Sequence, residues 1–473
     1  MPSPRKNILL FNPWIYDFAA YDFWTKPLGL LYIGSVLRQA GFEINLIDCL
    51  DRFHPLLLSQ YETPPAQYDF SGKYLRQEIE KPEVLKHVPR KYCRYGLPPH
   101  VVLELLDSLH RRPDVICVTS SMTYWYPAVR DAVIMLRQFF PQVPIILGGI
   151  YATLCPAHAQ ETVHPTWLLT GGGEKRILDK IAQISDQKIE NVEYQTLDDL
   201  PFPAFDLYSR VGALPLLTSR GCPNVCSFCA SRILSPEFRH RSPENVFAEI
   251  QHWNTVFNVT HFSFFDDALL HQADHSIKPL LRKISESGLR LYFHTPNGMA
   301  PKFIDDELSA LFKAAGVDTL RLSYESSDPK RQQSMSAKVT TRELKDALNS
   351  LEKAGYRRDS IGVYILFGLP GQTINEVKDT AQLVHDLGAR LFPASFSPIP
   401  GTLEWRRAIE MGVWNESDDL LLSNTTLFPI WSRTFGYEKC LELVSWLKEL
   451  NRKLHVHQLT EFESVERFQL VSE

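Results

Sequence analysis

The spacing of apolar residues predicts alternating strands and helices over the first 190 or so residues. Short apolar or alternating runs predict buried strands at 7–11, 42–49, 114–121 and 143–149. Apolar residues recur at helical spacing in 27–41, 101–111 and 128–140. This alternation indicates a parallel sheet with helices on both faces, an α/β fold of the Rossmann-like, doubly wound kind. We expect it to fill residues 1–195.

A second α/β region follows an irregular segment. Residues 196–209 are rich in proline and acidic residues and show no strand or helix period, which predicts a linker. Six more strand-like runs alternate with helical stretches in 210–410 and predict a partial (β/α)6 barrel of the TIM type. These runs are 214–219, 260–267, 289–295, 317–326, 360–368 and 389–398.

The end of the chain, 411–473, predicts a small helical extension. Within it a helix over 437–456 places Leu443, Leu447, Leu450 and Leu454 on one face, which we expect to pack on the barrel. The stretch 51–98 is charged and irregular, and no element is predicted there.

Composition and charge exclude several classes of protein. The hydrophobic fraction of 44% is enough for buried cores, and the formal net charge of -5 comes without a long basic run. We therefore expect no nucleic-acid partner. No apolar stretch approaches the roughly 20 residues that span a bilayer, and the first apolar run is too short for a signal peptide. These features predict a soluble, cytoplasmic protein.

Three of the eight cysteines form a cluster. Cys222, Cys226 and Cys229 lie in the sequence TSRGCPNVCSFCAS, directly after the first predicted barrel strand. Three thiolates can hold three irons of a [4Fe–4S] cluster and leave the fourth iron open. A structural zinc site is the alternative, but such sites usually use four ligands in paired spacing. The next cysteine, Cys440, lies about two hundred residues later.

The C-x-x-x-C-x-x-C loop resembles that of the radical S-adenosylmethionine (SAM) superfamily. The resemblance implies that the open iron binds the amino and carboxylate groups of SAM. It also implies that a reductant such as flavodoxin or ferredoxin drives cleavage of SAM to a 5′-deoxyadenosyl radical. The ends of the later strands resemble the SAM-contacting positions of that family. The candidates are Asp266, Asp267, Asn297, Gly298, Arg321, Glu325 and Ser397. For Arg321, a surface ion pair is the alternative.

The first domain resembles the cobalamin-binding domain that precedes many radical SAM domains. Its candidate contacts are Ser121, Met122, Thr123, Gly148, Gly149 and Gly172. The D-x-H-x-x-G signature that supplies a histidine to cobalt is absent, because Asp51 and His54 are wrongly spaced and no glycine follows. Either cobalamin binds without a protein histidine, or this domain no longer binds cobalamin.

The resemblance favours cobalamin-dependent C-methylation of a small molecule, with a weak preference for an apolar or aromatic one. A cobalamin-independent radical rearrangement, cyclisation or carbon–carbon coupling is the second enzymatic hypothesis. An iron–sulfur or cobalamin carrier or sensor is the non-enzymatic one. The sequence identifies no catalytic acid or base.

Overall fold

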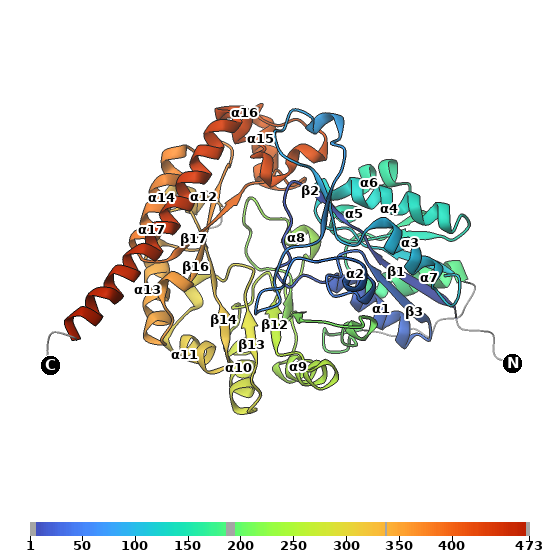
Figure 1. Ribbon diagram of the computed structural model, residues 1–473, viewed down its shortest axis with the longest axis horizontal. Coiled ribbons are helices and arrows are strands. Elements are labelled where there is room, and N and C mark those ends of the chain that lie inside the picture. Colours follow the sequence, from blue (N-terminus) through green and yellow to red (C-terminus); the bar gives the residue numbers. More distant parts are fainter. Residues whose placement is uncertain (1–5, 186–193, 336–337, 470–473) are drawn as a thin grey trace. The chain divides into compact units, whose positions relative to one another are not determined.

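The computed structural model describes residues 6–185, 194–335 and 338–469, and side chains up to residue 454 (Figure 1). The chain forms two compact units. Unit 1 consists of Met1–Cys222, Ala230–Ser263 and Asp419–Leu422. Unit 2 consists of Pro223–Cys229, Phe264–Asp418 and Ser423–Glu473. The boundaries predicted at 195, 209 and 410 stay predictions.

A five-stranded parallel sheet forms the centre of unit 1. Its order is β3-β1-β6-β7-β8. The strands are β1 (Asn7–Asn12), β3 (Glu43–Asp48), β6 (Val115–Val118), β7 (Ile145–Leu147) and β8 (Trp167–Leu168). The first four confirm the predicted strands, and β8 is an addition. The strand order reverses between β1 and β6, and sheets of this kind bind ligands at the carboxyl ends beside such a switch.

Unit 1 contains helices between and after these strands, and α1 and α7 pack on the sheet through their apolar faces. The helices are α1 (Leu28–Gln39), α3 (Pro99–Asp107), α4 (Tyr126–Phe139), α5 (Ile150–Leu154), α6 (Pro156–Val163), α7 (Glu174–Ser185) and α9 (Pro243–Phe257). Leu30 and Val36 of α1 join Ile177 and Ile181 of α7 in one core with the strands. The helices predicted before β3, β6 and β7 are therefore confirmed.

The stretch 51–98 is ordered, although no element was predicted in it. A second, antiparallel sheet has the order β2-β5-β4, with β2 (Ile15–Asp17), β4 (Arg76–Glu78) and β5 (Cys93–Tyr95). Helix α2 (Pro55–Gln60) also lies in this stretch, and the side chain of His54 caps it by accepting from the Leu56 N–H. Strands of three residues are too short for their alternation to show in the sequence.

The six strands predicted for the second region are all present, in two sheets. One has the order β14-β13-β12-β9, with β9 (Ala213–Leu216), β12 (His261–Phe264), β13 (Tyr292–His294) and β14 (Val317–Thr319). The other is parallel, in the order β15-β16-β17, with β15 (Arg321–Glu325), β16 (Gly362–Phe367) and β17 (Arg390–Ser395). Only Leu320 separates β14 from β15. The α/β class with parallel sheets is therefore confirmed.

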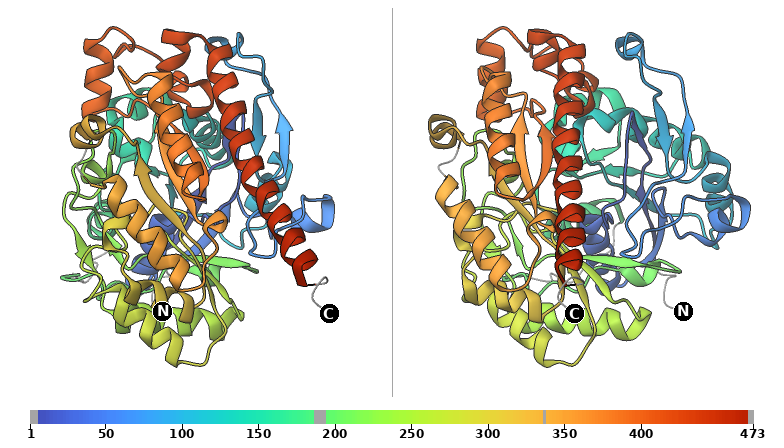
Figure 2. Two further views of the ribbon diagram at one scale, coloured as in Figure 1. Left: turned by 90° about the vertical axis from the view of Figure 1, so that its left-hand side faces the viewer. Right: turned by 60° about the vertical axis from the view of Figure 1, so that its left-hand side comes forward.

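Helices alternate with the strands of unit 2. They are α10 (Ile277–Glu286), α11 (Asp306–Ala314), α12 (Pro329–Met335), α13 (Thr341–Lys353), α14 (Ile374–Asp386), α15 (Leu403–Glu410), α16 (Trp431–Phe435) and α17 (Tyr437–Gln469). Helix α17, red in Figure 2, packs on β17 and α14. Its four predicted leucines are all buried, which confirms the apolar face. The Asn451 side chain also hydrogen-bonds both the N–H and the C=O of Leu391 at the edge strand. Among the described helices, none combines the length and apolar character needed to cross a bilayer.

Candidate functional site

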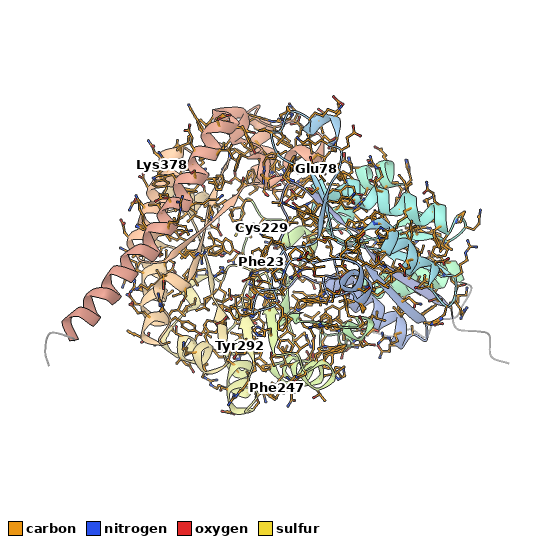
Figure 3. The ribbon with its side chains drawn as sticks, viewed as in Figure 1. Phe23, Glu78, Cys229, Phe247, Tyr292 and Lys378 are labelled. Atoms are coloured by element: carbon orange, nitrogen blue, oxygen red, sulfur yellow. The ribbon has the colours of Figure 1, made fainter. Side chains whose placement is uncertain are left out.

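Burial separates the three clustered cysteines from the other five. Cys222 and Cys226 are partly exposed and Cys229, labelled in Figure 3, is exposed. The others, Cys49, Cys93, Cys117, Cys155 and Cys440, are buried. Burial raises the pKa of the Cys117 thiol to about 12, which makes thiolate chemistry there unfavourable. The thiols that solvent or a cofactor can reach are therefore those of the predicted loop.

The boundary between the two units runs through this loop, between Cys222 and Pro223. Within the described residues, no three Cys, His, Asp or Glu side chains converge on a single metal position. Thiolates of a [4Fe–4S] cluster bind three different irons, so they do not need to converge in this way.

Backbone geometry fixes the loop on both sides of the boundary. Gly221 has φ +79°, and a Cβ there would lie 2.4 Å from the C=O oxygen of Glu237, so only glycine fits this turn. The Cys229 N–H donates to the C=O of Cys226 at 3.1 Å and closes a tight turn between the two thiols. These constraints suit a loop that wraps a cofactor.

Ser227, between two of the cysteines, is tied to two helices. Its N–H donates to the C=O of Met335 in α12, and its C=O accepts from the N–H of Glu404 in α15. Its hydroxyl donates to Oε1 of Glu404 at 2.8 Å, and Arg407 contacts the same oxygen at 2.9 Å. Glu404 is fully buried. This anchor could not be predicted from the sequence, because Ser227 and Glu404 lie 177 residues apart.

A pocket in unit 2 brings the loop together with the ends of two strands. It is lined by Asn224 from the loop, Asp267 and His271 after β12, Gly298 after β13, and Lys338. Of the residues predicted to contact SAM, Asp267 and Gly298 meet here. Asn224, His271 and Lys338 were not predicted.

Two other predicted residues shape the wall of this pocket. Asn297 donates from Nδ2 to the carbonyl oxygens of Phe265 and Asp266, at 3.0 and 3.2 Å, and so clasps the loop that presents Asp267. Asp266 itself is buried. At Gly298 a Cβ would lie 2.3 Å from Ser323 Oγ, so glycine is needed for the segment after β13 to come this close to β15.

Glu325 ends β15 in a strained conformation. Its φ is +72°, a region that non-glycine residues adopt uncommonly, and backbone strain of this kind concentrates at functional sites. Burial raises the pKa of its carboxyl group, and the charge of Lys338 opposes that shift. Since Lys338 lines the pocket, Glu325 belongs to its electrostatic surroundings.

Arg321 and Ser397 do not line this pocket. The Arg321 guanidinium lies over the ring of Phe392, 3.9 Å from its centroid, and not in the surface ion pair that the sequence left open. The Ser397 hydroxyl donates to the C=O of Ser423 at 2.7 Å, which holds the segment after β17 to the following 3-10 helix.

In unit 1, the residues predicted to contact cobalamin form an exposed ledge at the carboxyl ends of β6, β7 and β8. Ser121, Met122, Gly149 and Gly172 are exposed, Gly148 is half-buried and Thr123 is buried. A Cβ on Gly149, with φ +96°, would lie 2.2 Å from the C=O oxygen of Ser120.

Two hydroxyl groups bind the loops of this ledge to one another. Ser120 Oγ donates to the C=O of Gly148 at 2.6 Å and accepts from the N–H of Ala152. Thr153 Oγ1 donates to the C=O of Gly149 and accepts from the N–H of Gly171. These bonds hold the loops of the ledge in place, and its glycines allow close approach of a flat macrocycle.

Comparisons with known proteins agree with this geometry. Residues 216–384, which include the cysteine loop, match the radical SAM superfamily. A cytidylyl-2-hydroxyethylphosphonate methyltransferase from Streptomyces wedmorensis is 23% identical, over 89% of this chain and 85% of its own length.

Two solved structures share the fold. The radical SAM methyltransferase TsrM from Kitasatospora setae, solved with cobalamin and a [4Fe–4S] cluster, has a TM-score of 0.63 at 17% identity, over 86% of this chain and 78% of TsrM. The cobalamin-dependent radical enzyme OxsB, solved with aqua-cobalamin and SAM, has a TM-score of 0.55 at 15% identity, over 94% of this chain and 62% of OxsB. Residues 216–384 thus form a radical SAM domain, and this superfamily uses a [4Fe–4S] cluster and SAM.

Proposed function

We propose that this enzyme is a cobalamin-dependent radical SAM methyltransferase. The observation that carries the proposal is the loop of three accessible cysteines whose Asn224 lines the same pocket as Asp267 and Gly298. When bound, the cofactors supply reductive cleavage of SAM and a methyl group for an unactivated carbon. The similarity to a methyltransferase over 89% of the chain favours methylation over rearrangement, coupling or a carrier role.

In this proposal Cys222, Cys226 and Cys229 ligate the cluster, and the pocket beside them holds SAM. Asp267 is an exposed carboxylate on the pocket wall and suits the SAM ammonium, which needs a charge-assisted acceptor. Glu325 suits the ribose hydroxyls. Asp266 and Asn297 hold the β12 loop in place and act on SAM through Asp267.

The ledge of unit 1 would hold cobalamin. Met122 and Ile150 are large apolar side chains with 46% and 38% exposure, and they flank the glycines of the β7 loop. Thr123 is buried below them and supports the turn. His54 caps α2 and Asp51 pairs with Lys26, so both are engaged in the fold. The proposal therefore includes no histidine bond to cobalt.

The test is anaerobic reconstitution with iron, sulfide and hydroxocobalamin, followed by desalting. We expect a retained corrin absorption band, and 5′-deoxyadenosine after addition of SAM and a strong reductant. Cys226→Ala should lose the cluster and the deoxyadenosine, whereas Cys440→Ala, at a buried thiol, serves as the control. Without retained corrin the methyltransferase proposal fails, and without deoxyadenosine a carrier role is favoured.

A glycine pair tests the ledge itself. Gly149→Ala should lower corrin retention, because its Cβ would collide with the Ser120 backbone. Gly288→Ala has a comparable positive φ of +72° but open space around it, so it controls for backbone strain alone. Equal retention in the two variants would contradict the assignment of the ledge.

The proposal also covers the partners of the enzyme and its location. We infer a small-molecule substrate and a cytoplasmic location. We also infer a reductant such as flavodoxin or ferredoxin, because radical SAM chemistry consumes a low-potential electron.

A further inference from the structure

One face of the β15-β16-β17 sheet carries polar side chains. Alternation along β15 places Arg321 and Ser323 on one face and buried Leu322 on the other. The register with β16 shifts between Ser323 and Glu325, so this alternation ends at Ser323. We call the face of Arg321 and Ser323 the polar face.

Register places two cations side by side at one end of the polar face. Gly362 pairs with Arg321 on one side and Arg390 on the other. A Cβ on Gly362 would lie 2.6 Å from Arg321 Cδ, so the absent side chain lets Arg321 lie across β16. Its guanidinium reaches Phe392, whose ring Arg390 also approaches, at 5.6 Å.

Arg321 has no carboxylate partner within the parts of the chain that the structure describes. Its Nη1 donates to the C=O of Leu320 at 3.0 Å, and its other contact is the Phe392 ring. Burial and the like charge of Arg390 lower its pKa to about 10. A half-buried guanidinium without a counter-charge is unfavourable.

Two other arginines, both buried, are paired with a carboxylate that compensates their charge. Arg52, with a side chain 6% exposed, pairs with Asp22 at 3.0 Å. Arg241, 4% exposed, pairs with Glu249. Both of these arginines have a carboxylate partner, and among the described residues Arg321 has none.

We propose that Arg321 binds an anionic group of the substrate, a carboxylate or a phosphonate. The planar guanidinium can give such a group two parallel hydrogen bonds, while Phe392 covers one of its faces. This inference rests on the proposed function, because it needs a substrate on the polar face with SAM at its other end. There Gly298, which lines the pocket, lies against Ser323 and Tyr364, two residues along the sheet from Arg321 and Gly362.

Tyr364 lies near two charged groups, Arg321 and Glu325. Its pKa is raised by burial, and the charges of both Arg321 and Glu325 act on it. Its hydroxyl donates to the C=O of Pro296 at 2.8 Å, so its ring is held in place beside Ser323. A substrate anchored at Arg321 would therefore extend past a fixed aromatic ring towards Gly298 and the SAM pocket.

The experiment measures binding of simple anions to the cluster-loaded protein by isothermal titration calorimetry, with SAM present. The probes are phenylphosphonate, benzoate and the neutral benzyl alcohol. Arg321→Met keeps the aliphatic contact with Phe392, Arg321→Lys keeps the charge, and Arg342→Met, at a side chain 91% exposed, is the control. We expect an anion to bind to wild type and to the control, about tenfold or more weakly to Arg321→Met, and with intermediate affinity to Arg321→Lys.

Equal anion affinity in Arg321→Met and wild type would overturn the proposal. Two other results would also overturn it: the alcohol binds as tightly as the anions, or neither anion binds. A second titration, with SAM alone, distinguishes a carboxylate of the substrate from the carboxylate of SAM. A tenfold loss of SAM affinity in Arg321→Met without any anion site would assign Arg321 to the carboxylate of SAM instead. None of these measurements uses cobalamin, so failure of the anion site and failure of the methyltransferase proposal are distinguishable.

Discussion

Glu404→Ala tests whether the anchor behind the cysteine loop matters. The carboxylate of Glu404 is fully buried, and its Oε1 accepts from Ser227 Oγ and Arg407. Its Oε2 is buried without a hydrogen-bond partner among the described residues. The substitution removes both side-chain contacts but keeps the hydrogen bond from the backbone N–H of residue 404 to the C=O of Ser227. The loop therefore loses one of its ties and keeps another.

The size of the effect follows from these contacts. Ser227 is 3% exposed, and a buried hydroxyl left without an acceptor costs about 1–3 kcal/mol. The lost methylene adds about 0.8 kcal/mol. The contact with Arg407, whose side chain is 42% exposed, contributes less than about 1 kcal/mol. We expect Glu404→Ala to lower the free energy of unfolding by about 2–4 kcal/mol.

The assay pairs denaturant unfolding with the rate at which a chelator removes iron from the reconstituted protein. Ser227→Ala removes only the donor and should cost about 1 kcal/mol, and Glu404→Gln should preserve the acceptor. A double-mutant cycle should give a coupling energy of about 1–2 kcal/mol between Ser227 and Glu404. Unchanged iron release in Glu404→Ala, together with negligible coupling, would refute the reasoning.

Three further predictions concern other parts of the chain. Gly298→Ala should weaken SAM binding about tenfold by calorimetry, because its Cβ would collide with Ser323, whereas Gly29→Ala, with open space around it, should not. Glu249→Gln should cost about 3–5 kcal/mol in denaturant unfolding, because it leaves Arg241 charged and buried; a loss below 1 kcal/mol would contradict this. Burial lowers the pKa of His158, so the unfolded chain takes up a proton first, and stability should be lost as the pH falls below about 6.5. His158→Phe should flatten that dependence, measured as the unfolding midpoint against pH.

Features that depend on local pattern could be predicted from the sequence. Parallel strands end at a common edge, so the order of strand-end motifs was enough to group Asp267 with Gly298. The cysteine loop could be found by spacing alone, and burial then separated its thiols from the other five by an independent criterion. The strands of the antiparallel sheet, at three residues each, carried too little pattern.

Features that depend on contacts between distant residues could not be predicted from the sequence. Ser227 and Glu404 are ordinary residues in the sequence, and only the approach of α15 to the loop makes them partners. The strained backbone of Glu325 likewise follows from neighbouring strands and not from its residue type. The predicted contact of Asn297 with SAM stays a prediction, and its two hydrogen bonds to the β12 loop are a further contact that the sequence did not indicate.

Arg321 lies between these two cases. The period of two along β15 places it on the same face as Ser323, and this much could be predicted from the sequence. Its neighbours in register on β16 and β17 are Gly362, Arg390 and Phe392, and none of them is a carboxylate. The polar face therefore has its cations at one end, and at the other Ser323 lies against Gly298 of the pocket. Cations at one end would orient a substrate with an anionic end, and this distinguishes such a substrate from a wholly apolar one.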